Sequence, residues 1–482
     1  MAQHAKYRFS GPLTWVLACL AGAIGGYALT NVLPPQVDAV GNPQVALVLV
    51  APFALLLILI AAMPLIHERL WHAYFPDVAF FCGSIVIVYY MKGYGHRGTE
   101  QVLHAAREYY SFIALVGGLY VVSGGILTDI RGRGKPWSNT LILAAGAVLA
   151  NIVGTTGASV LLIRPFIRFN RGRLRPVHVL FFIFVVSNCG GSLTPIGDPP
   201  LYLGFLKGVP FVWMFNNLLV NWLVTVGPLL VLFFTIDSYF HHFPSRWRVQ
   251  QTDPPEPELH RRRHGPPVTL RGGVGVVSLA LIVAGVFIDP LLRNVAWVGH
   301  FPVGATFQIG VATCAYLFSD RELYRGNEFS FFPVKEVGLL FLGIFATMVP
   351  ALGYLAAHGP ELDIRTPTQF YFLSGVLSAV LDNAPTYMNF LQLAVGDVEL
   401  TSEVIRLRLL TGDGARILAA ISTGAVFFGA MTYIGNGPNF MVRSIAESAG
   451  VKMPSFIGYA IRASIFLLPV LILHWWLSIA LR

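Results

Sequence analysis

Charged residues are scarce in this chain. Only 12% of its 482 residues are Asp, Glu, Lys or Arg, whereas 55% are hydrophobic. Soluble domains contain about 25% charged residues, so this composition excludes an ordinary soluble protein. Apolar runs of about 20 residues, the length that a helix needs to cross a bilayer, recur along the whole chain. The chain is therefore predicted to be an all-α polytopic membrane protein.

Cysteine is scarce as well, and nucleotide-binding motifs are missing. The four cysteines, Cys19, Cys82, Cys189 and Cys314, lie in or beside the apolar runs and form neither a disulfide pattern nor a zinc-binding one. No Walker or dinucleotide-binding pattern occurs. We therefore expect neither an ATP-driven pump nor an enzyme, and no cofactor apart from Na⁺ as a transported or coupling ion.

The basic residues predict topology rather than nucleic-acid binding. The net charge is +9, but Lys and Arg sit mainly in short loops between apolar runs, where they mark the cytoplasmic side of a membrane. Membrane lipid is the expected partner. Apolar segments are predicted at 13–33, 44–65, 76–92, 109–127, 138–163, 176–205, 210–237, 272–292, 302–318, 333–357, 367–392, 412–446 and 455–481.

Segment 138–163 is predicted to enter and leave the membrane on one side. Its basic flanks are Arg131, Arg133 and Lys135 before it, and Arg164, Arg168, Arg171, Arg173 and Arg175 after it. Both flanks are then cytoplasmic, so the segment is a re-entrant hairpin. Counting the spans in both directions places further basic residues in the cytoplasm: Lys6, Arg8, Arg246, Arg248, Arg261, Arg262, Arg263 and Arg271. The same count puts residues 358–366 outside, and the mixed-charge loop after segment 367–392 lacks a basic excess, so this segment is predicted to be a second hairpin, entered from outside.

Hairpins that face opposite sides predict an inverted repeat. The expected fold has about eleven transmembrane helices plus two re-entrant hairpins. Its parts are N-terminal scaffold helices (1–108), a first repeat half with hairpin 138–163 (109–237), a cytoplasmic linker (238–270) and a second repeat half with hairpin 367–392 (271–482).

Polar passages rich in Gly and Pro interrupt the apolar sequence at corresponding places in the two halves. Residues 151–156 are followed by 187–200, and residues 382–386 are followed by 432–439. Broken backbone at membrane depth survives only where it is buried in protein or lines a cavity. Paired breaks of this kind point to the binding site of a secondary transporter, where freed carbonyls and polar side chains coordinate Na⁺. The candidate ion- or substrate-binding residues are Asn151, Thr155, Thr156, Asn188, Gly190, Gly191, Thr194, Asp198, Ser378, Asp382, Asn383, Thr386, Thr432, Gly435, Asn436 and Asn439.

Two acids, Asp198 and Asp382, are predicted to lie within the membrane. A carboxylate at that depth costs at least roughly 2.5 kcal/mol, so it must be paired, ion-bound or protonated. One carboxylate cannot hold a proton and a cation together, which is the basis of proton/cation exchange. Asp198 is the weaker candidate, because the following Pro199 and Pro200 are typical of a helix start that it caps. His474, beside two tryptophans on the last helix, is interpreted as an interfacial anchor.

These motifs resemble the ion transporter superfamily, which includes sodium/dicarboxylate symporters, citrate–metal transporters, arsenite permease-like proteins and NhaD-type sodium/proton antiporters. The passage Asn188-Cys-Gly-Gly-Ser-Leu-Thr-Pro-Ile-Gly-Asp-Pro-Pro is similar to the Asn-x-Gly-Gly…Thr-x-Ile-Gly-Asp-Pro pattern of the antiporter and permease branches. Asp382-Asn383-Ala-Pro-Thr resembles their second hairpin tip, and Gly435-Asn436-Gly-Pro-Asn439 resembles their later broken helix. The likeness covers most of the chain from about residue 110 to 446 and is closest to citrate-transporter-like proteins and bacterial sodium:proton antiporters.

The resemblance implies an elevator-type transporter that forms a homodimer, with one sodium site at each hairpin tip. It maps one site to Asn151 and Gly190 or Gly191, and the other to Ser378, Asn383 and Gly435, to which we add Asp382 as the acid. Antiporter relatives often carry Asp-Asn at the first tip, whereas Ala150 precedes Asn151 here. The Ser-Asn-Thr tips of the dicarboxylate branch are absent from both hairpins, which argues against a carboxylate substrate.

The leading hypothesis is a Na⁺/H⁺ antiporter of a bacterial inner membrane, with a cytoplasmic N-terminus. Asp382 is the principal exchangeable carboxylate in this hypothesis, and Asp198 assists it. One alternative is a sodium-coupled symporter of citrate or another di- or tricarboxylate, in which Thr155, Thr156, Asn383 and Thr386 hold the carboxylates. A further alternative is an anion channel or oxyanion permease. The expected partners are thus sodium, protons and, under the alternatives, a small carboxylate or other anion.

Overall fold

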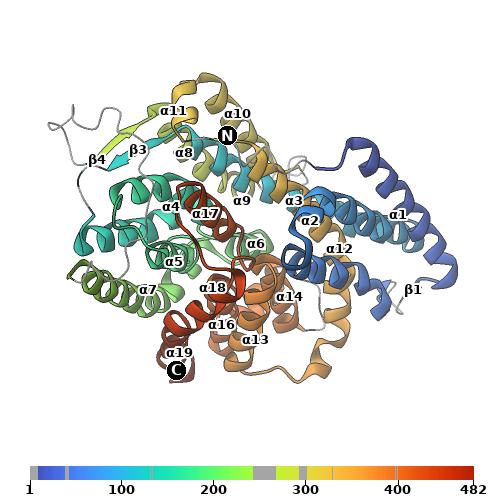
Figure 1. Ribbon diagram of the computed structural model, residues 1–482. Helices are drawn as coiled ribbons and strands as arrows, with labels where there is room; N and C mark the ends of the chain where they lie inside the picture. The colour runs from blue at the N-terminus through green and yellow to red at the C-terminus, as the bar shows by residue number, and fades with distance from the viewer. Residues whose placement is uncertain are drawn as a thin grey trace.

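The computed structural model describes residues 9–37, 43–130, 132, 134–242, 268–292, 301–327, 329–396, 398 and 400–481. Several of the basic residues used to predict the topology lie outside the described residues. They are Lys6, Arg8, Arg131, Arg133, Arg246, Arg248, Arg261, Arg262 and Arg263. Helices make up most of the described chain, and their arrangement is drawn in Figure 1.

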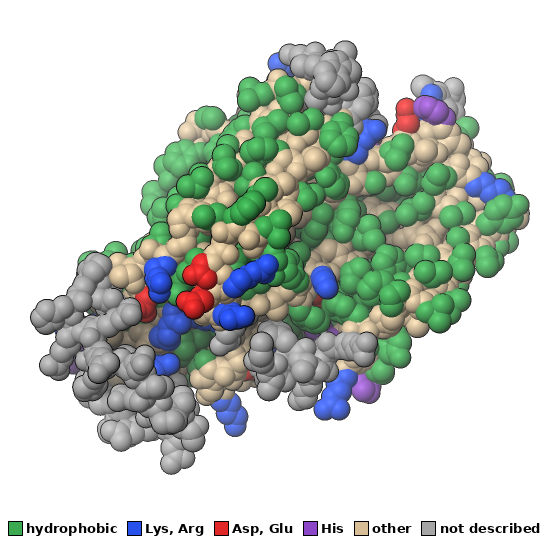
Figure 2. Space-filling view, turned by 90° about the horizontal axis from the view of Figure 1, so that it is seen from above, with side chains coloured by type: hydrophobic (Ala, Val, Ile, Leu, Met, Phe, Trp, Pro, Cys, Tyr) green, Lys and Arg blue, Asp and Glu red, His purple; other side chains and the backbone are tan. Residues whose placement is uncertain are grey.

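The protein is a multi-pass membrane protein. Seven helices of the described ranges are long and apolar enough to cross a bilayer, or eight if the bent pair α18 (Phe456–Phe466) and α19 (Leu468–Trp475) counts as one span. Hydrophobic side chains cover much of the outer surface, as expected for contact with lipid (Figure 2). The all-α membrane fold is therefore confirmed. The count of about eleven crossings stays a prediction, because α8 (Gly273–Gly285) and α10 (Val303–Phe318) are shorter than the roughly 20 residues of a full span.

The N-terminal spans match the predicted ones closely. Helix α1 (Pro12–Val32) packs against α2 (Ala51–Gly93), which follows the short helix η1 (Leu47–Val50). His67 in α2 has non-helical backbone angles (φ −152°, ψ 69°), so α2 consists of two helical segments. The break lies between the predicted spans 44–65 and 76–92.

A two-stranded ribbon was not predicted. Strand β3 (Leu127–Ile130) pairs antiparallel with β4 (Val268–Arg271), and Leu127 lies opposite Arg271. The last residues of the predicted linker 238–270 are therefore attached to the residues that precede the first hairpin. A second, shorter ribbon joins β1 (Gln36–Val37) to β2 (Pro43–Gln44).

Helix α4 (Pro136–Phe169) folds back on itself. A straight helix of 34 residues would be about 50 Å long. Instead, the Gly134 amide donates to the Phe169 carbonyl at 2.8 Å, so the two ends of α4 are adjacent. The reversal lies at Gly154, whose angles (φ 77°, ψ 155°) are essentially restricted to glycine.

The second hairpin is built from α13 (Pro367–Val380) and α14 (Asn383–Val395). The Phe370 and Phe390 rings, near the start and the end of this pair, lie 6.3 Å apart edge to face. The chain therefore reverses at Leu381 and Asp382, within the predicted segment 367–392.

Each hairpin is followed by a broken helix. The first comprises α5 (Pro176–Val185), η2 (Cys189–Gly191) and α6 (Pro199–Lys207). The second comprises α16 (Gly412–Phe428), η6 (Gly429–Met431) and α17 (Gly437–Ser448). Both breaks lie inside the buried core, and α6 packs against α14 near the centre of Figure 1. The remaining elements are α3 (Gly95–Gly124), α7 (Phe211–His242), α9 (Ile288–Leu292), α11 (Arg321–Gly326), α12 (Phe332–His358), η5 (Gly359–Leu362), α15 (Ser402–Leu409) and η7 (Trp476–Ala480).

Candidate functional site

The Asp198 carboxylate lies at the point where the two halves of the chain meet. Asp198 is the residue before α6, in the break of the first broken helix, and only 1% of it is exposed. Pro199 and Pro200 begin α6 without needing a hydrogen-bond acceptor for their nitrogens. The Asp198 side chain makes no capping bond, so the sequence-based suggestion that it caps this helix is wrong. Its carboxylate is left available to groups from elsewhere.

Three neutral donors hold this carboxylate. The Thr155 hydroxyl of the first hairpin donates to Oδ1 at 2.8 Å. The Asn383 amide of the second hairpin donates to Oδ2 at 2.6 Å, and the Asn436 amide of the second broken helix donates to Oδ1 at 3.1 Å. Residues from three of the four predicted passages thus converge on an acid from the remaining passage.

A small cavity lies beside the acid and contains no basic group. It measures about 20 Å³ and lies between α3, the tip of the first hairpin and the start of α6; its lining includes Gly154, Thr156 and Tyr202 as well as Asp198. None of the described residues that line it is Lys or Arg. About 10–15 Å³ suffices for one water molecule, so the cavity fits a water or a small ion but nothing larger.

One acceptor near the acid is left without a donor. Asn383 is fully buried, and its Oδ1 has no hydrogen-bond partner among the described residues, while its amide nitrogen binds Asp198. Leaving a buried acceptor unmet costs about 1–3 kcal/mol. A carboxylate and an amide oxygen next to each other are the ligands of a hard cation, so these residues fit an ion such as Na⁺.

Asp382 makes a capping contact at the second hairpin. Its Oδ1 accepts the Ala384 backbone amide at 3.0 Å, so Asp382 caps the N-terminus of α14. Of the two predicted acids, it is therefore Asp382 that caps a helix and Asp198 that gathers side chains from both halves.

The two hairpins make matching contacts with their broken helices. The Thr194 hydroxyl donates to the Asn151 carbonyl at 2.6 Å, and the Thr432 hydroxyl donates to the Ala379 carbonyl at 2.6 Å. In the same way, the Thr155 amide donates to Gly197 and the Asn383 amide donates to Gly435. These pairs give Thr155 and Asn383 the same place at the two hairpin tips, and give Asp198 and Asn436 the same place after Gly197 and Gly435.

Close backbone contact explains one pair of glycines in each break. A Cβ on Gly197 would lie 1.9 Å from the Gly191 carbonyl oxygen, and a Cβ on Gly435 would lie 2.6 Å from the Gly429 oxygen. Real Cβ atoms do not approach so closely, so each unwound segment crosses itself at a position that only glycine can occupy.

Amide side chains lock the two broken helices together. Asn188 donates to the Asn439 Oδ1 at 2.7 Å and accepts the Asn436 amide at 3.1 Å. Asn439 in turn donates to the carbonyls of Gly429 and Thr432. All three asparagines are buried. The structure thus unites residues that are about half the chain apart.

At the first predicted sodium site, the donors and acceptors are already paired. Asn151 donates to the carbonyls of Ala147 and Gly190 and accepts the Leu193 amide at 2.8 Å. The Gly190 carbonyl also accepts the Trp222 indole at 2.8 Å. Gly191 lies beside Thr155 and Gly197. In this conformation Asn151 connects the first hairpin to its broken helix, and its side-chain oxygen already accepts one hydrogen bond.

The second predicted site is closer to Asp198. Ser378 donates to the Ala425 carbonyl at 2.5 Å, and its own carbonyl lies against Gly435, together with the Gly429 carbonyl. Thr386 donates to the Asp382 carbonyl within α14. Backbone oxygens therefore gather at this hairpin tip, next to the unpaired oxygen of Asn383.

Sequence reasoning missed two buried histidine sites. His474 was expected to be an interfacial anchor, but it is fully buried, with Tyr371 and Asn221 on its two ring nitrogens. The expectation is therefore wrong. The adjacent Trp475 and Trp476 led to this expectation, because tryptophan is typical of membrane interfaces.

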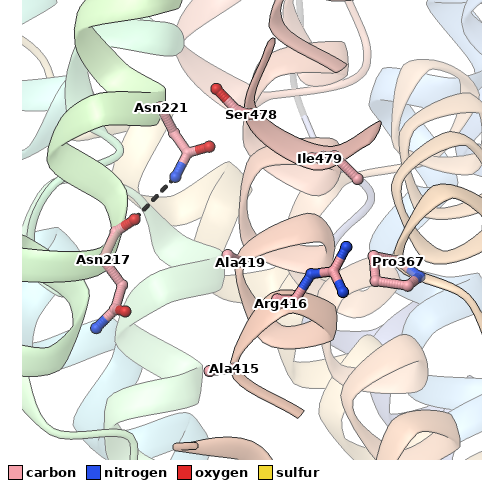
Figure 3. Close-up of a pocket in the computed structure, with 8 residues that line it drawn as sticks. All are labelled: Asn217, Asn221, Pro367, Ala415, Arg416, Ala419, Ser478 and Ile479. Atoms are coloured by element: carbon pink, nitrogen blue, oxygen red, sulfur yellow. Dashed lines mark hydrogen bonds between the residues drawn. The ribbon is translucent and has the colours of Figure 1, made fainter. Parts of the chain in front are cut away.

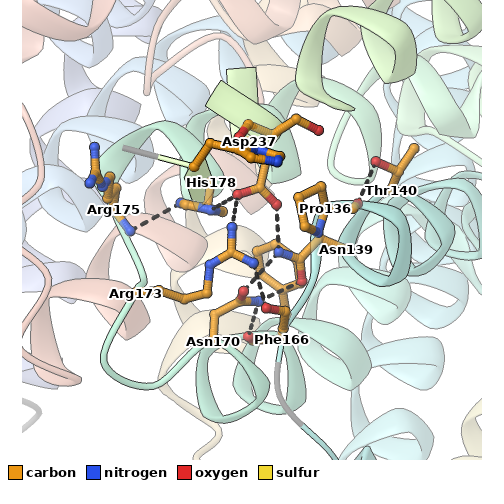
Figure 4. Close-up of polar contacts among 12 residues, drawn as sticks. Pro136, Asn139, Thr140, Phe166, Asn170, Arg173, Arg175, His178 and Asp237 are labelled. Atoms are coloured by element: carbon orange, nitrogen blue, oxygen red, sulfur yellow. Dashed lines mark hydrogen bonds and ion pairs between the residues drawn. The ribbon is translucent and has the colours of Figure 1, made fainter. Parts of the chain in front are cut away.

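The second site surrounds Asp237, near the end of α7 (Figure 4). Asp237 accepts from Asn139 at 2.8 Å, from the His178 Nε2 at 2.9 Å and from the Arg173 guanidinium. The Arg175 backbone amide donates to the His178 Nδ1, which leaves the proton of the neutral ring on Nε2. The side-chain amides of Asn139 and Asn170 also donate a hydrogen bond to each other. This cluster therefore joins both ends of the first hairpin to α5 and α7.

Chemically, the central arrangement can bind a proton or a small cation. Thr155, Asn383 and Asn436 hold the buried carboxylate without neutralising it. Either a proton or a cation would neutralise it, and neither needs a large opening.

Comparison with known proteins shows the family of the chain. A search of curated proteins gives no match. A family model described as "Putative citrate transport" matches residues 42–479, which include both hairpins and both broken helices. The sequence-based resemblance to citrate-transporter-like members of the ion transporter superfamily is confirmed. With nearly its whole length matched, the chain belongs to this citrate transport family.

Proposed function

We propose that this protein is a secondary active transporter that exchanges Na⁺ for H⁺, with Asp198 as the group that binds one ion or the other. The observation that carries the proposal is the environment of Asp198: a buried carboxylate with three neutral donors and no basic residue in the cavity beside it. An uncompensated charge at such depth costs at least roughly 2.5 kcal/mol. Binding H⁺ or Na⁺ removes that cost, and the two compete for the same oxygens.

The ligands for Na⁺ come from both halves in this proposal. The Asp198 carboxylate supplies the charge, the unpaired Asn383 Oδ1 supplies a second oxygen, and the carbonyls near Ser378 and Gly435 complete the shell after a small rearrangement. Asp382, which the sequence made the principal acid, then acts by holding the start of α14.

The reversals at Gly154 and Leu381 support two re-entrant hairpins, and the matching contacts of Thr194 and Thr432 support an inverted repeat. We place the protein in a bacterial inner membrane with its N-terminus in the cytoplasm, as a homodimer working by elevator motion. Arg271, paired with Leu127 just before the first hairpin, supports one common side for the linker and the hairpin base.

Proteoliposomes with a pH-sensitive dye inside test the proposal. A pulse of external Na⁺ should raise the internal pH, because protons leave as Na⁺ enters. Asp198→Asn should abolish this response, while Asp382→Asn, which retains a good capping residue, should preserve most of it. Asp363→Asn, at an exposed surface pair with Arg365, is the matched control. A sodium pulse that produces no pH change in liposomes containing folded protein contradicts antiport.

Sodium-coupled citrate symport is the second candidate, because the matching family is described by citrate transport. In that case Thr155, Thr156 and Asn383 would bind carboxylates in a wider conformation of the site. Against it, Lys207 at the far end of α6 is already paired with Glu108 at 2.7 Å and offers no counter-charge. Uptake of labelled citrate that requires Na⁺, with no change of internal pH, would establish symport instead.

A further inference from the structure

A second cavity lies apart from Asp198, near the C-terminal end of the chain. It measures about 80 Å³ and lies between α7, the start of α13, α16 and η7. Figure 3 shows its walls: Asn217 and Asn221 on α7, Arg416 on α16 and Ser478 on η7. The Ser478 hydroxyl is buried and has no partner among the described residues. The volume and the polar walls are sufficient for more than one water molecule.

A buried histidine, His474, contacts one of the residues that line this cavity. Asn221 lines the cavity and accepts from the His474 Nε2 at 3.0 Å. His474 is fully buried, one helical turn before Ser478. Ionisable groups buried in membrane proteins are functional candidates by default. The Asp198 site does not use His474, so its burial needs another explanation.

The partners of His474 define where its protons lie. Asn221 donates its own amide to the Asn217 carbonyl at 2.8 Å, so its oxygen faces His474 and requires a proton on Nε2. Nδ1 faces the Tyr371 hydroxyl at 3.1 Å, and this hydroxyl also lies 3.1 Å from the Leu471 carbonyl. The hydroxyl has one proton, which can point to only one of these two acceptors.

Both protonation states of His474 are therefore satisfied by the same heavy-atom positions. When the ring is neutral, Tyr371 donates to Nδ1. When Nδ1 is protonated, the Tyr371 hydroxyl turns to the Leu471 carbonyl and accepts the new N–H. The only movement required is a turn of the Tyr371 hydroxyl hydrogen about the C–O bond. Both ring nitrogens of His474 therefore keep a hydrogen-bond partner in either state.

We propose that His474 is a reversible proton-binding site, with the Tyr371 hydroxyl adapting to each state. A hydronium ion that reaches the ring gives up its proton, an N–H bond forms at Nδ1, and water remains. The charged and titratable groups around His474 come from several elements. Within the described ranges they include Tyr371 on α13, Cys189 of η2 within electrostatic reach of Tyr371, and Arg416 on α16 across the cavity with its exposed partner Asp413.

The site connects the second hairpin to the rest of the protein. Tyr371 belongs to the first arm of that hairpin, Asn221 to α7, and His474 to the last helix. The Trp475 indole donates to Thr368 of the same arm at 3.1 Å. Protonation of His474 thus changes a contact between the hairpin and its surroundings. An effect of this contact on ion exchange rests on the proposed antiport, whereas proton binding by His474 does not depend on it.

Nuclear magnetic resonance of the full chain in lipid nanodiscs, with ¹⁵N-labelled histidine, tests proton binding without measuring transport. The chain has 13 histidines, so the His474 signal is assigned as the one lost in His474→Gln. We expect its ring nitrogens to change from the neutral Nε2–H form to the imidazolium between about pH 8 and pH 5. A ring that keeps one neutral form over this range overturns the proposal.

Tyr371→Phe tests the adapting hydroxyl. It removes the acceptor of a charged donor, a stronger bond than the neutral one, so the His474 titration midpoint should move to lower pH by about one unit, or tenfold in proton affinity. Tyr459→Phe is the matched control, because this buried tyrosine donates to the Ala430 carbonyl instead and should leave the midpoint unchanged. An unchanged midpoint in Tyr371→Phe, or an equal shift in both variants, excludes the hydroxyl's role. Loss of sodium exchange in Asp198→Asn with the His474 titration intact separates the two proposals.

Discussion

The Asn383 amide lies 2.6 Å from the Asp198 carboxylate, although 184 residues separate them in the chain and each belongs to a different half. This bond joins the tip of the second hairpin to the break of the first broken helix. Because the Asn383 amide nitrogen holds the acid while its Oδ1 has no partner among the described residues, the same side chain also offers a ligand beside the acid.

Thr155→Val is expected to weaken sodium-dependent transport while leaving the fold intact. The substitution keeps the shape of the side chain but removes the hydroxyl that donates to Asp198 at 2.8 Å. A hydrogen bond to a charged group contributes about 1.5–3 kcal/mol, so the apparent affinity for Na⁺ or H⁺ should change roughly tenfold or more. Sodium titrations of transport in proteoliposomes measure the change. Thr155→Ser keeps the hydroxyl and should behave like the native protein; equal behaviour of the two variants would contradict this role.

Gly197→Ala is expected to destabilise the protein strongly. The added Cβ would lie 1.9 Å from the Gly191 carbonyl oxygen, so the backbone of the break would have to move. Overpacking a core typically costs about 1–3 kcal/mol, and contact with backbone cannot be relieved by a side-chain rotation. Thermal unfolding in detergent should show a lower midpoint. Gly310→Ala, in α10 with nothing within 4 Å of the new Cβ, is the control and should not lower it.

Asp237→Asn is expected to loosen the base of the first hairpin. It removes the charge that Arg173 and His178 both contact. Breaking a fully buried ion pair costs about 3–5 kcal/mol, and we expect a smaller loss here because the Arg173 side chain is 21% exposed. The midpoint of unfolding should fall, and the hairpin ends should become more accessible to protease. The exposed pair Asp363–Arg365 provides the comparison, since Asp363→Asn should leave the midpoint within error. Similar midpoints for the two variants would mean that the cluster contributes little.

Single cysteines should establish the topology of the hairpins. In a background that lacks the four native cysteines, Lys135→Cys and Arg171→Cys lie at exposed positions on either side of α4. Both should react with an impermeant thiol reagent from the cytoplasmic side, because the ends of α4 are adjacent. Labelling of the two positions from opposite sides would show that α4 crosses the bilayer.

Arg365→Cys and Thr401→Cys provide the same test for the second hairpin, and both positions are exposed. They should react from the side opposite to Lys135→Cys. Reaction of Arg365→Cys from the cytoplasm would contradict the inverted arrangement of the two hairpins.

The membrane fold could be predicted because long apolar runs have few alternatives to a helix in lipid. The breaks could be predicted as well: Gly154, Gly197 and Gly435 all occur where the backbone turns or crosses itself. These positions can be recognised from the sequence because the local backbone conformation requires glycine there.

The roles within the site could not be predicted in the same way. Asp382 and Asp198 both precede helices, and only their neighbours in space distinguish them. Asp382 bonds a backbone amide two residues away, whereas Asp198 gathers Thr155, Asn383 and Asn436 from distant segments. The buried state of His474 depends equally on α7 and α13, which the residues around it in sequence do not reveal.

The correspondence between Asp198 and Asn436 has a consequence for how many charges the centre can carry. Two equivalent acids at a pseudo-twofold axis would repel each other and would share a proton or a divalent ion between them. An acid facing an amide places one negative charge, not two, at these corresponding positions, and the amide can only help to orient it. The second negative charge near Asp198 comes instead from Asp382, a buried carboxylate within electrostatic reach at the tip of the second hairpin, so the matching positions alone do not set the charge of the centre.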